Sequence, residues 1–261
     1  MPAKLYVVHG SHPCATVQRA LDMKSVPYRV VELLPPMHAA LQRLRFGTRT
    51  VPGLTLESGE KLSGSRAIIR RVEELAPEPS LLPADPEERA AVARAEEWGD
   101  EVWQPMARRL LWQTFTRHPQ AMKSYQAGSR FALPSPAVRA LAPLVNAAER
   151  RLNGAEEGAV RADLRSLSGH LDRIDDWLRD GVLGGETVNA ADLQIAPTSR
   201  LMLTIGDVRP YFAGRPAEAH AMGLFGACFS PRLQYSSARN WLPTLDSARQ
   251  RPRKPELRRL S

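Results

Sequence analysis

The segment Ser11-His12-Pro13-Cys14 carries the residue types best suited to chemistry in this sequence. It lies between a predicted strand and a predicted helix, where first-turn N–H groups and the helix dipole stabilise negative charge. Ser11 is therefore placed to donate a hydrogen bond to a thiolate, and Cys14 to ionise at a low pKa. The alternative is that Ser11 only caps the helix and Cys14 is a small core side chain. Nothing local orients His12, so we expect it at the surface.

Two further places are candidates for binding. Thr50-Val51-Pro52 precedes a predicted strand. If the Val51–Pro52 bond is cis, the Val51 backbone turns outward and can pair with a peptide; a trans bond is the commoner state. Gly64-Ser65 opens a predicted helix, so Ser65 forms either a small anion site with the first-turn N–H groups or a plain cap.

Hydrophobic periodicity predicts the order β-α-β-α-β-β-α for the first eighty residues, which is that of a thioredoxin-like unit. The predicted elements span residues 4–8, 13–24, 28–33, 38–44, 51–56, 61–62 and 65–75.

The rest of the chain is predicted to be all-helical. A proline-rich linker at 79–86 ends with Asp85 as a helix cap and Pro86 in the first turn. One long helix then runs over 87–114, bent near Gly99 or Pro105, and others cover 137–152, 164–178 and 189–203. We predict a thioredoxin-like domain at 1–78, a helical-bundle domain at 87–245 and a disordered tail at 246–261.

Composition points away from several classes of protein. The formal net charge of +8 is concentrated in residues 249–261, which hold six Lys or Arg and one Glu. We expect a solvated tail and no nucleic-acid partner; the alternative is a tail that contacts nucleic acid or an anionic membrane surface. The longest apolar runs are too short to span a membrane. Cys14 and Cys228 are the two cysteines, so a disulfide framework is not expected and a reducing cytoplasm is the default location. The sequence predicts no metal cofactor.

Taken together, these motifs resemble the glutathione S-transferase family and its glutaredoxin relatives. Leu62 to Ile69 is similar to the family's Leu-x-Glu-Ser-x-Ala-Ile stretch. Thr187 to Leu193 is similar to its Thr-x-Ala-Asp segment, in which Asn189 and Asp192 form a capping box. The resemblance covers residues 4–205.

The resemblance implies that glutathione is the co-substrate and that Ser11 holds its thiolate by a hydrogen bond. The implied glutathione contacts are Thr50, Val51, cis Pro52, Gly64 and Ser65. The implied electrophile pocket lies between the domains, with Trp103, Met106, Leu110 and Trp112 as candidates, although such residues are also typical of a core. The family further implies a homodimer that detoxifies hydrophobic electrophiles.

Two departures keep alternatives open. Gly64 stands where many transferases have Glu or Gln, so one contact to the γ-glutamyl group is missing. The position that is the first cysteine in glutaredoxins is Ser11 here, which leaves only Cys14. The leading hypothesis is a glutathione transferase. The alternatives are a monothiol reductase through Cys14 and a non-catalytic binding protein that keeps the fold.

Overall fold

The N-terminal domain is built on a four-stranded mixed sheet. The structure is a computed structural model that describes residues 2–35 and 37–225. The strand order is β2-β1-β3-β4. The strands are β1 (Ala3–Val8), β2 (Tyr28–Leu33), β3 (Gly53–Thr55) and β4 (Lys61–Ser63). β1 pairs parallel with β2 and antiparallel with β3, which pairs antiparallel with β4.

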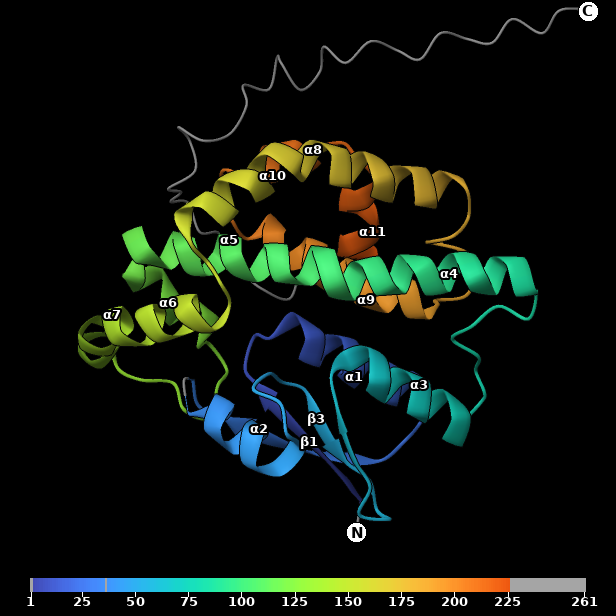
Figure 1. Cartoon of the computed structure of the whole chain (residues 1–261), viewed down its shortest axis with the longest axis horizontal. Coiled ribbons are helices and arrows are strands. Elements are labelled where there is room, and N and C mark those ends of the chain that lie inside the picture. The colour runs from blue at the N-terminus through green and yellow to red at the C-terminus, as the bar shows by residue number, and fades with distance from the viewer. Residues whose placement is uncertain (1, 36, 226–261) are drawn as a thin grey trace, which may run out of the picture.

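Three helices complete this domain, and their order confirms the predicted thioredoxin-like unit. They are α1 (His12–Met23), α2 (His38–Phe46) and α3 (Ser65–Leu75). α1 and α3 lie between the sheet and the helical domain (Figure 1). Their apolar faces and the alternate residues of β1 share one core, which includes Leu5, Val17 and Ile68. The predicted third strand is shorter than expected, because strand pairing begins only at Gly53.

The rest of the described chain is helical, as predicted. Asp85 caps α4 by accepting hydrogen bonds from the N–H groups of Glu87 and Glu88. The helices are α4 (Pro86–Trp98), α5 (Gln104–Arg117), α6 (Met122–Tyr125), α7 (Ser135–Leu152), α8 (Glu157–Arg179), α9 (Ala190–Leu203), α10 (Arg209–Phe212) and α11 (Pro216–Phe225), with a 3₁₀ turn at Pro119–Ala121.

α4 and α5 form one long rod across the molecule, interrupted by the π-helical turn Gly99–Trp103 (Figure 1). The sequence predicts a bend near Gly99 or Pro105, and the helix is interrupted at the turn that begins at Gly99. A Cβ on Gly99 would lie 3.1 Å from the side chains of Gln194 and Ile195, so glycine allows α9 to pack closely here.

α9 is the central helix of the second domain. Its predicted capping box is present: Asn189 Oδ1 accepts from the N–H groups of Ala191 and Asp192, and Asp192 accepts from the Asn189 N–H. α9 also packs on α1, where Thr16 donates to the Leu193 carbonyl at 2.7 Å. The second domain therefore contacts the first through α1, whose N-terminus carries the candidate residues Ser11 and Cys14.

Cys228 and the predicted tail at 246–261 lie outside the described residues. Within the described ranges, no helix combines the length and apolar character that crossing a membrane requires.

Candidate functional site

The N-terminus of α1 is open. Gly10 adopts a positive φ of 75°, which turns the chain from β1 into the helix. Ser11 is the N-cap residue, and its side chain makes no capping hydrogen bond. The first-turn N–H groups of α1 are therefore not satisfied by their own cap, and the helix dipole adds partial positive charge.

Cys14 lies one turn further in and belongs to the core. It is 2% exposed and packs in the apolar cluster under the sheet. Burial raises the pKa of its thiol to about 11, against smaller opposing contributions from hydrogen bonds with the Ser11 side chain and the Val8 backbone. A thiol that is buried and protonated at neutral pH is a poor nucleophile.

The expectation that His12 lies at the surface is wrong. His12 is 6% exposed, and its Nδ1 lies 2.9 Å from Thr198 Oγ1. Thr198 donates its own proton to the Gln194 carbonyl, so Nδ1 carries the hydrogen in this contact. Burial, with a smaller contribution from Arg108, lowers the His12 pKa well below its usual value. His12 is thus a neutral ring that ties α1 to α9, a long-range contact that no local pattern reveals.

Ser11 faces a cavity of about 230 Å³ between the two domains. The N-terminal domain contributes residues 8–13 and 32–35, His38, Thr50 and Val51. The Val51–Pro52 bond is cis, as the resemblance implies. The structure therefore brings Ser11 together with Thr50 and Val51 at one cavity, while Pro52 is buried and does not line it.

The opposite wall combines apolar and aromatic side chains with the guanidinium of Arg108. Arg108, Leu111, Trp112 and Phe115 line the cavity from α5, at spacings that place them on one stripe of the helix. The Phe115 ring makes edge contacts with Trp112 and with Tyr125, at centroid distances of 5.4 and 5.2 Å. A flat apolar group therefore has a row of rings to pack against.

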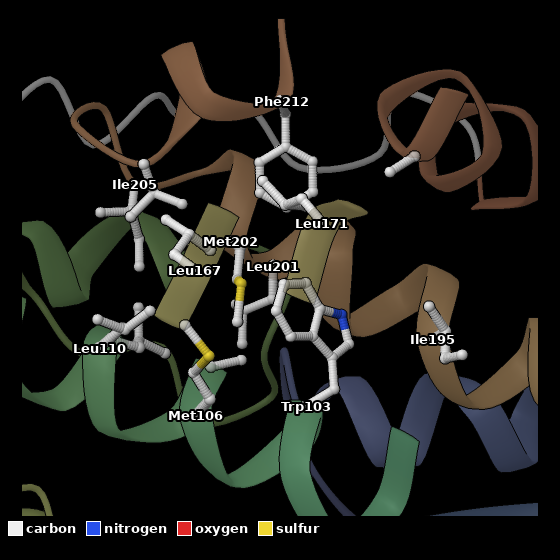
Figure 2. Packing of buried hydrophobic residues seen from close by; sticks show 14 of the residues in the cluster. Trp103, Met106, Leu110, Leu167, Leu171, Ile195, Leu201, Met202, Ile205 and Phe212 are labelled. Carbon is white, nitrogen blue, oxygen red and sulfur yellow. The ribbon is translucent and has the colours of Figure 1, made fainter. Parts of the chain in front are cut away.

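Trp103, Met106 and Leu110 do not line this cavity, which corrects the prediction made for them. They are 0%, 1% and 4% exposed, and they belong to the core of the helical domain. Figure 2 shows them pointing toward Leu167, Leu171 and Phe212. Trp112, the fourth candidate, does line the cavity.

A segment far away in sequence closes the cavity beside Ser11. Glu32, in β2, accepts hydrogen bonds from the Ser129 hydroxyl and the Arg130 N–H. His9 Nε2 lies 2.8 Å from the Ala127 carbonyl. These contacts hold the loop after α6 against the edge of the sheet. Sequence reasoning missed this contact, because residues 128–136 show only a break in helical periodicity.

Ser65 is buried, and protein groups already occupy its hydroxyl. It is 2% exposed, and its Oγ accepts from Gln104 Nε2 at 3.4 Å. Its hydroxyl is also hydrogen-bonded to Asp100, which opposes the burial that raises the Asp100 pKa. Gly64, in contrast, borders a separate shallow hollow together with Arg66 and Asp100. An anion bound here would therefore accept hydrogen bonds from the first-turn N–H groups of α3, because the Ser65 hydroxyl already has protein partners.

A buried polar pair closes the end of the cavity formed by α2 and α7. His38 Nδ1 lies 3.5 Å from Glu149 Oε1, and both residues line the cavity. Burial lowers the His38 pKa to about 4 and raises the Glu149 pKa to about 7. His38 is therefore neutral at neutral pH, so this contact is not an ion pair. Across the described residues, no group of three or more His, Cys, Asp or Glu is arranged to hold a metal.

Comparison with known proteins finds a family match for the N-terminal domain. Residues 5–80 match the family described as the N-terminal domain of glutathione S-transferase. No curated protein matches the sequence at a significant level.

Solved structures extend the likeness to the whole fold. A glutathione transferase from Populus trichocarpa is 20% identical, with 85% of this chain and 92% of the other covered and a TM-score of 0.58. A Sphingobium β-etherase is 19% identical, with 85% and 94% covered and a TM-score of 0.62. A maleylacetoacetate isomerase from Anaeromyxobacter dehalogenans, with dicarboxyethyl glutathione in its active site, is 20% identical, with 85% and 89% covered and a TM-score of 0.53. The chain thus carries an N-terminal domain that matches the glutathione S-transferase model, and its two-domain fold is similar to that of solved glutathione transferases.

Proposed function

We propose that the protein is a glutathione transferase that joins the sulfur of glutathione, or of a related small thiol, to an electrophile. The observation that carries this proposal is Ser11, at the uncapped N-terminus of α1, facing a cavity that also contains Val51. A thiolate bound there accepts a hydrogen bond from the Ser11 hydroxyl and lies in the positive field of the helix. Its pKa falls, so the thiol loses its proton to water at neutral pH.

The Ser11 hydroxyl has one proton, and its side chain is hydrogen-bonded with the Cys14 sulfur. A bound thiolate is the stronger acceptor, because a charged acceptor makes a hydrogen bond about twice as strong as a neutral one. The hydroxyl therefore turns to the ligand, and Cys14 serves only as packing.

The rest of glutathione extends toward α3. The Val51 backbone pairs with the cysteinyl unit, beside Thr50. The γ-glutamyl carboxylate approaches the first-turn N–H groups of α3 at Gly64-Ser65. In the shallow hollow beside Gly64, Arg66 and Asp100 carry the charges that complement this zwitterionic end. They compensate for the side-chain contact that Gly64 lacks.

Calorimetric titration with glutathione at up to millimolar concentration, followed by conjugation assays with 1-chloro-2,4-dinitrobenzene, tests the proposal. We expect binding, turnover by Cys14→Ala and loss of turnover in Ser11→Ala. Disulfide reduction that disappears only in Cys14→Ala supports the monothiol reductase instead. Binding without turnover identifies the binding-protein alternative, and absence of binding rejects a glutathione function. We also propose a homodimer, which sedimentation equilibrium tests.

A further inference from the structure

We propose that Arg108 forms an anion-binding subsite, so that the electrophile taken by this cavity carries a carboxylate next to its reactive carbon and an aromatic body. This inference rests on the proposed transferase function and names its substrate class. It begins from a cation that lines the cavity without a matching anion.

Arg108 is the one Arg or Lys among the residues that line the cavity in the described part of the chain. Its printed hydrogen bond is a long one, from Nη1 to Gln104 Oε1 at 3.5 Å. No ion pair between Arg108 and a carboxylate within 4.0 Å is found among the described residues. Its neighbour Arg109, in contrast, forms a bidentate pair with Asp163 at 2.7 and 2.8 Å.

The charge of Arg108 is therefore only partly compensated. Burial lowers its pKa to about 10, and repulsion from Arg109 works in the same direction, while Asp100 acts against both. The two carboxyl groups of the cavity do not supply the missing charge. Glu32 is engaged by Ser129 and Arg130, and burial raises the pKa of Glu149 to about 7, so that this carboxyl is only partly ionised at neutral pH. A partly desolvated guanidinium facing a cavity is a strong partner for a planar oxyanion.

The position of Arg108 in the cavity determines which part of the substrate carries the anion. Arg108 lines the same cavity as Ser11 and His12, and its charge adds to the burial that lowers the His12 pKa, so we place it near the proposed thiolate. Trp112 and Phe115 follow on the same stripe of α5, further along the cavity. A ligand that contacts all three therefore has its anion near the sulfur and its aromatic part against the rings. Aryl-substituted unsaturated carboxylates have this arrangement.

3-Benzoylacrylate is a probe of this class. The thiolate sulfur forms a bond to the alkene carbon that bears the carboxylate, and the alkene π electrons move to form the enolate of the aryl ketone. The enolate carbon then takes a proton from water. No bond is lost other than the π bond, and no oxidant or reductant is required.

The test compares 3-benzoylacrylate with its ethyl ester, which keeps the ring and the alkene but has no charge. Rates with glutathione are divided by the uncatalysed rate of each compound. In Arg108→Met we expect kcat/KM for the acid to fall about 10- to 100-fold and that for the ester to change less than about twofold. Arg108→Lys recovers part of the loss. Arg165→Met, at an exposed position of α8, is the matched control with no expected effect.

Equal losses for acid and ester in Arg108→Met would overturn the inference, since they would make Arg108 a group that acts on the thiolate or on folding. An unchanged ratio of the two rates would overturn it as well. Binding of the saturated 3-benzoylpropionate, followed by tryptophan fluorescence without glutathione, separates this proposal from the proposed function. Weaker binding in Arg108→Met supports the subsite even if no thiol is turned over, and unchanged binding rejects it.

Discussion

Two helix N-termini in this protein have opposite hydrogen-bonding states. At α9, the side chains of Asn189 and Asp192 satisfy the exposed backbone donors, and the whole box is buried. At α1, Ser11 occupies the same position but leaves the first turn uncapped beside a cavity. Both sequences contain a residue type that favours a cap. A satisfied N-terminus fixes the fold, and an unsatisfied one beside a cavity is available for a ligand.

The largest expected effect is the loss of stability when the capped N-terminus of α9 is disrupted. Asp192 accepts from the N–H groups of Gly184 and Asn189 and lies 2.7 Å from His220 Nε2. Asp192→Ala leaves the buried Asn189 N–H and the buried His220 ring without this partner and should lower the free energy of unfolding by about 3–5 kcal/mol. Denaturant unfolding measures it. Asp85→Ala, which removes an exposed cap, is the control at about 1 kcal/mol; equal losses at both sites would contradict the comparison.

At the uncapped N-terminus of α1, a substitution should change the properties of a bound thiol and leave the stability of the fold nearly unchanged. Ser11→Ala removes no capping bond, so we expect its free energy of unfolding to stay within about 0.5 kcal/mol of wild type. Bound glutathione, however, loses a charge-assisted hydrogen bond of about 1.5–3 kcal/mol, which raises its thiol pKa by about one to two units. Thiolate absorbance against pH measures this shift. A stable variant with an unchanged thiol pKa removes Ser11 from the mechanism.

Glu149 sharpens the comparison, because it is a buried carboxyl without the partners that Asp192 has. Its folded pKa of about 7 lies above the unfolded value, so its stabilising contribution is complete below about pH 4 and lost as pH rises through about 7. Gln does not ionise, so Glu149→Gln does not lose stability as pH rises. The variant should gain about 1–3 kcal/mol over wild type at pH 8 and much less at pH 5.

Unfolding at both pH values checks this prediction. The titration of neighbouring His38 occurs in both proteins and cancels in the difference. A variant that is less stable at pH 8 than wild type would show that Glu149 works there as an ionised partner.

The smallest effect concerns Cys14. Cys14→Ala removes one buried sulfur from the sheet core and should cost about 1–2 kcal/mol, with conjugation activity within about twofold of wild type. Alkylation of the native protein at Cys14 should be slow at neutral pH, because the thiol is buried and its pKa is raised. Mass spectrometry after timed alkylation measures this. Fast labelling would revive the reductase alternative.

The features that could be predicted from the sequence are those that depend on residues close together in the chain. The order of helices and strands along the chain, the caps at Asp85 and Asn189, and the helix start at Ser65 depend on residues close together in sequence, so periodicity and capping rules found them. The cis bond at Pro52 came only from the resemblance. Contacts between distant segments were not predictable. His12 is buried by Thr198, and Glu32 holds the loop at Ser129, because tertiary packing brings together chain segments about 100 or more residues apart.

The π-helical turn Gly99–Trp103 has a consequence for how this site can change. A π turn accommodates one residue more than an α-helical turn, and each residue of an α-helix advances the side chains by about 100°. This extra residue sets the rotational phase of α5 relative to α4. It directs Arg108 and Trp112 to the cavity and Trp103 to the core. Deleting one residue within this turn would rotate the downstream faces, so specificity in this fold can be altered by a length change at a distance from every substrate contact.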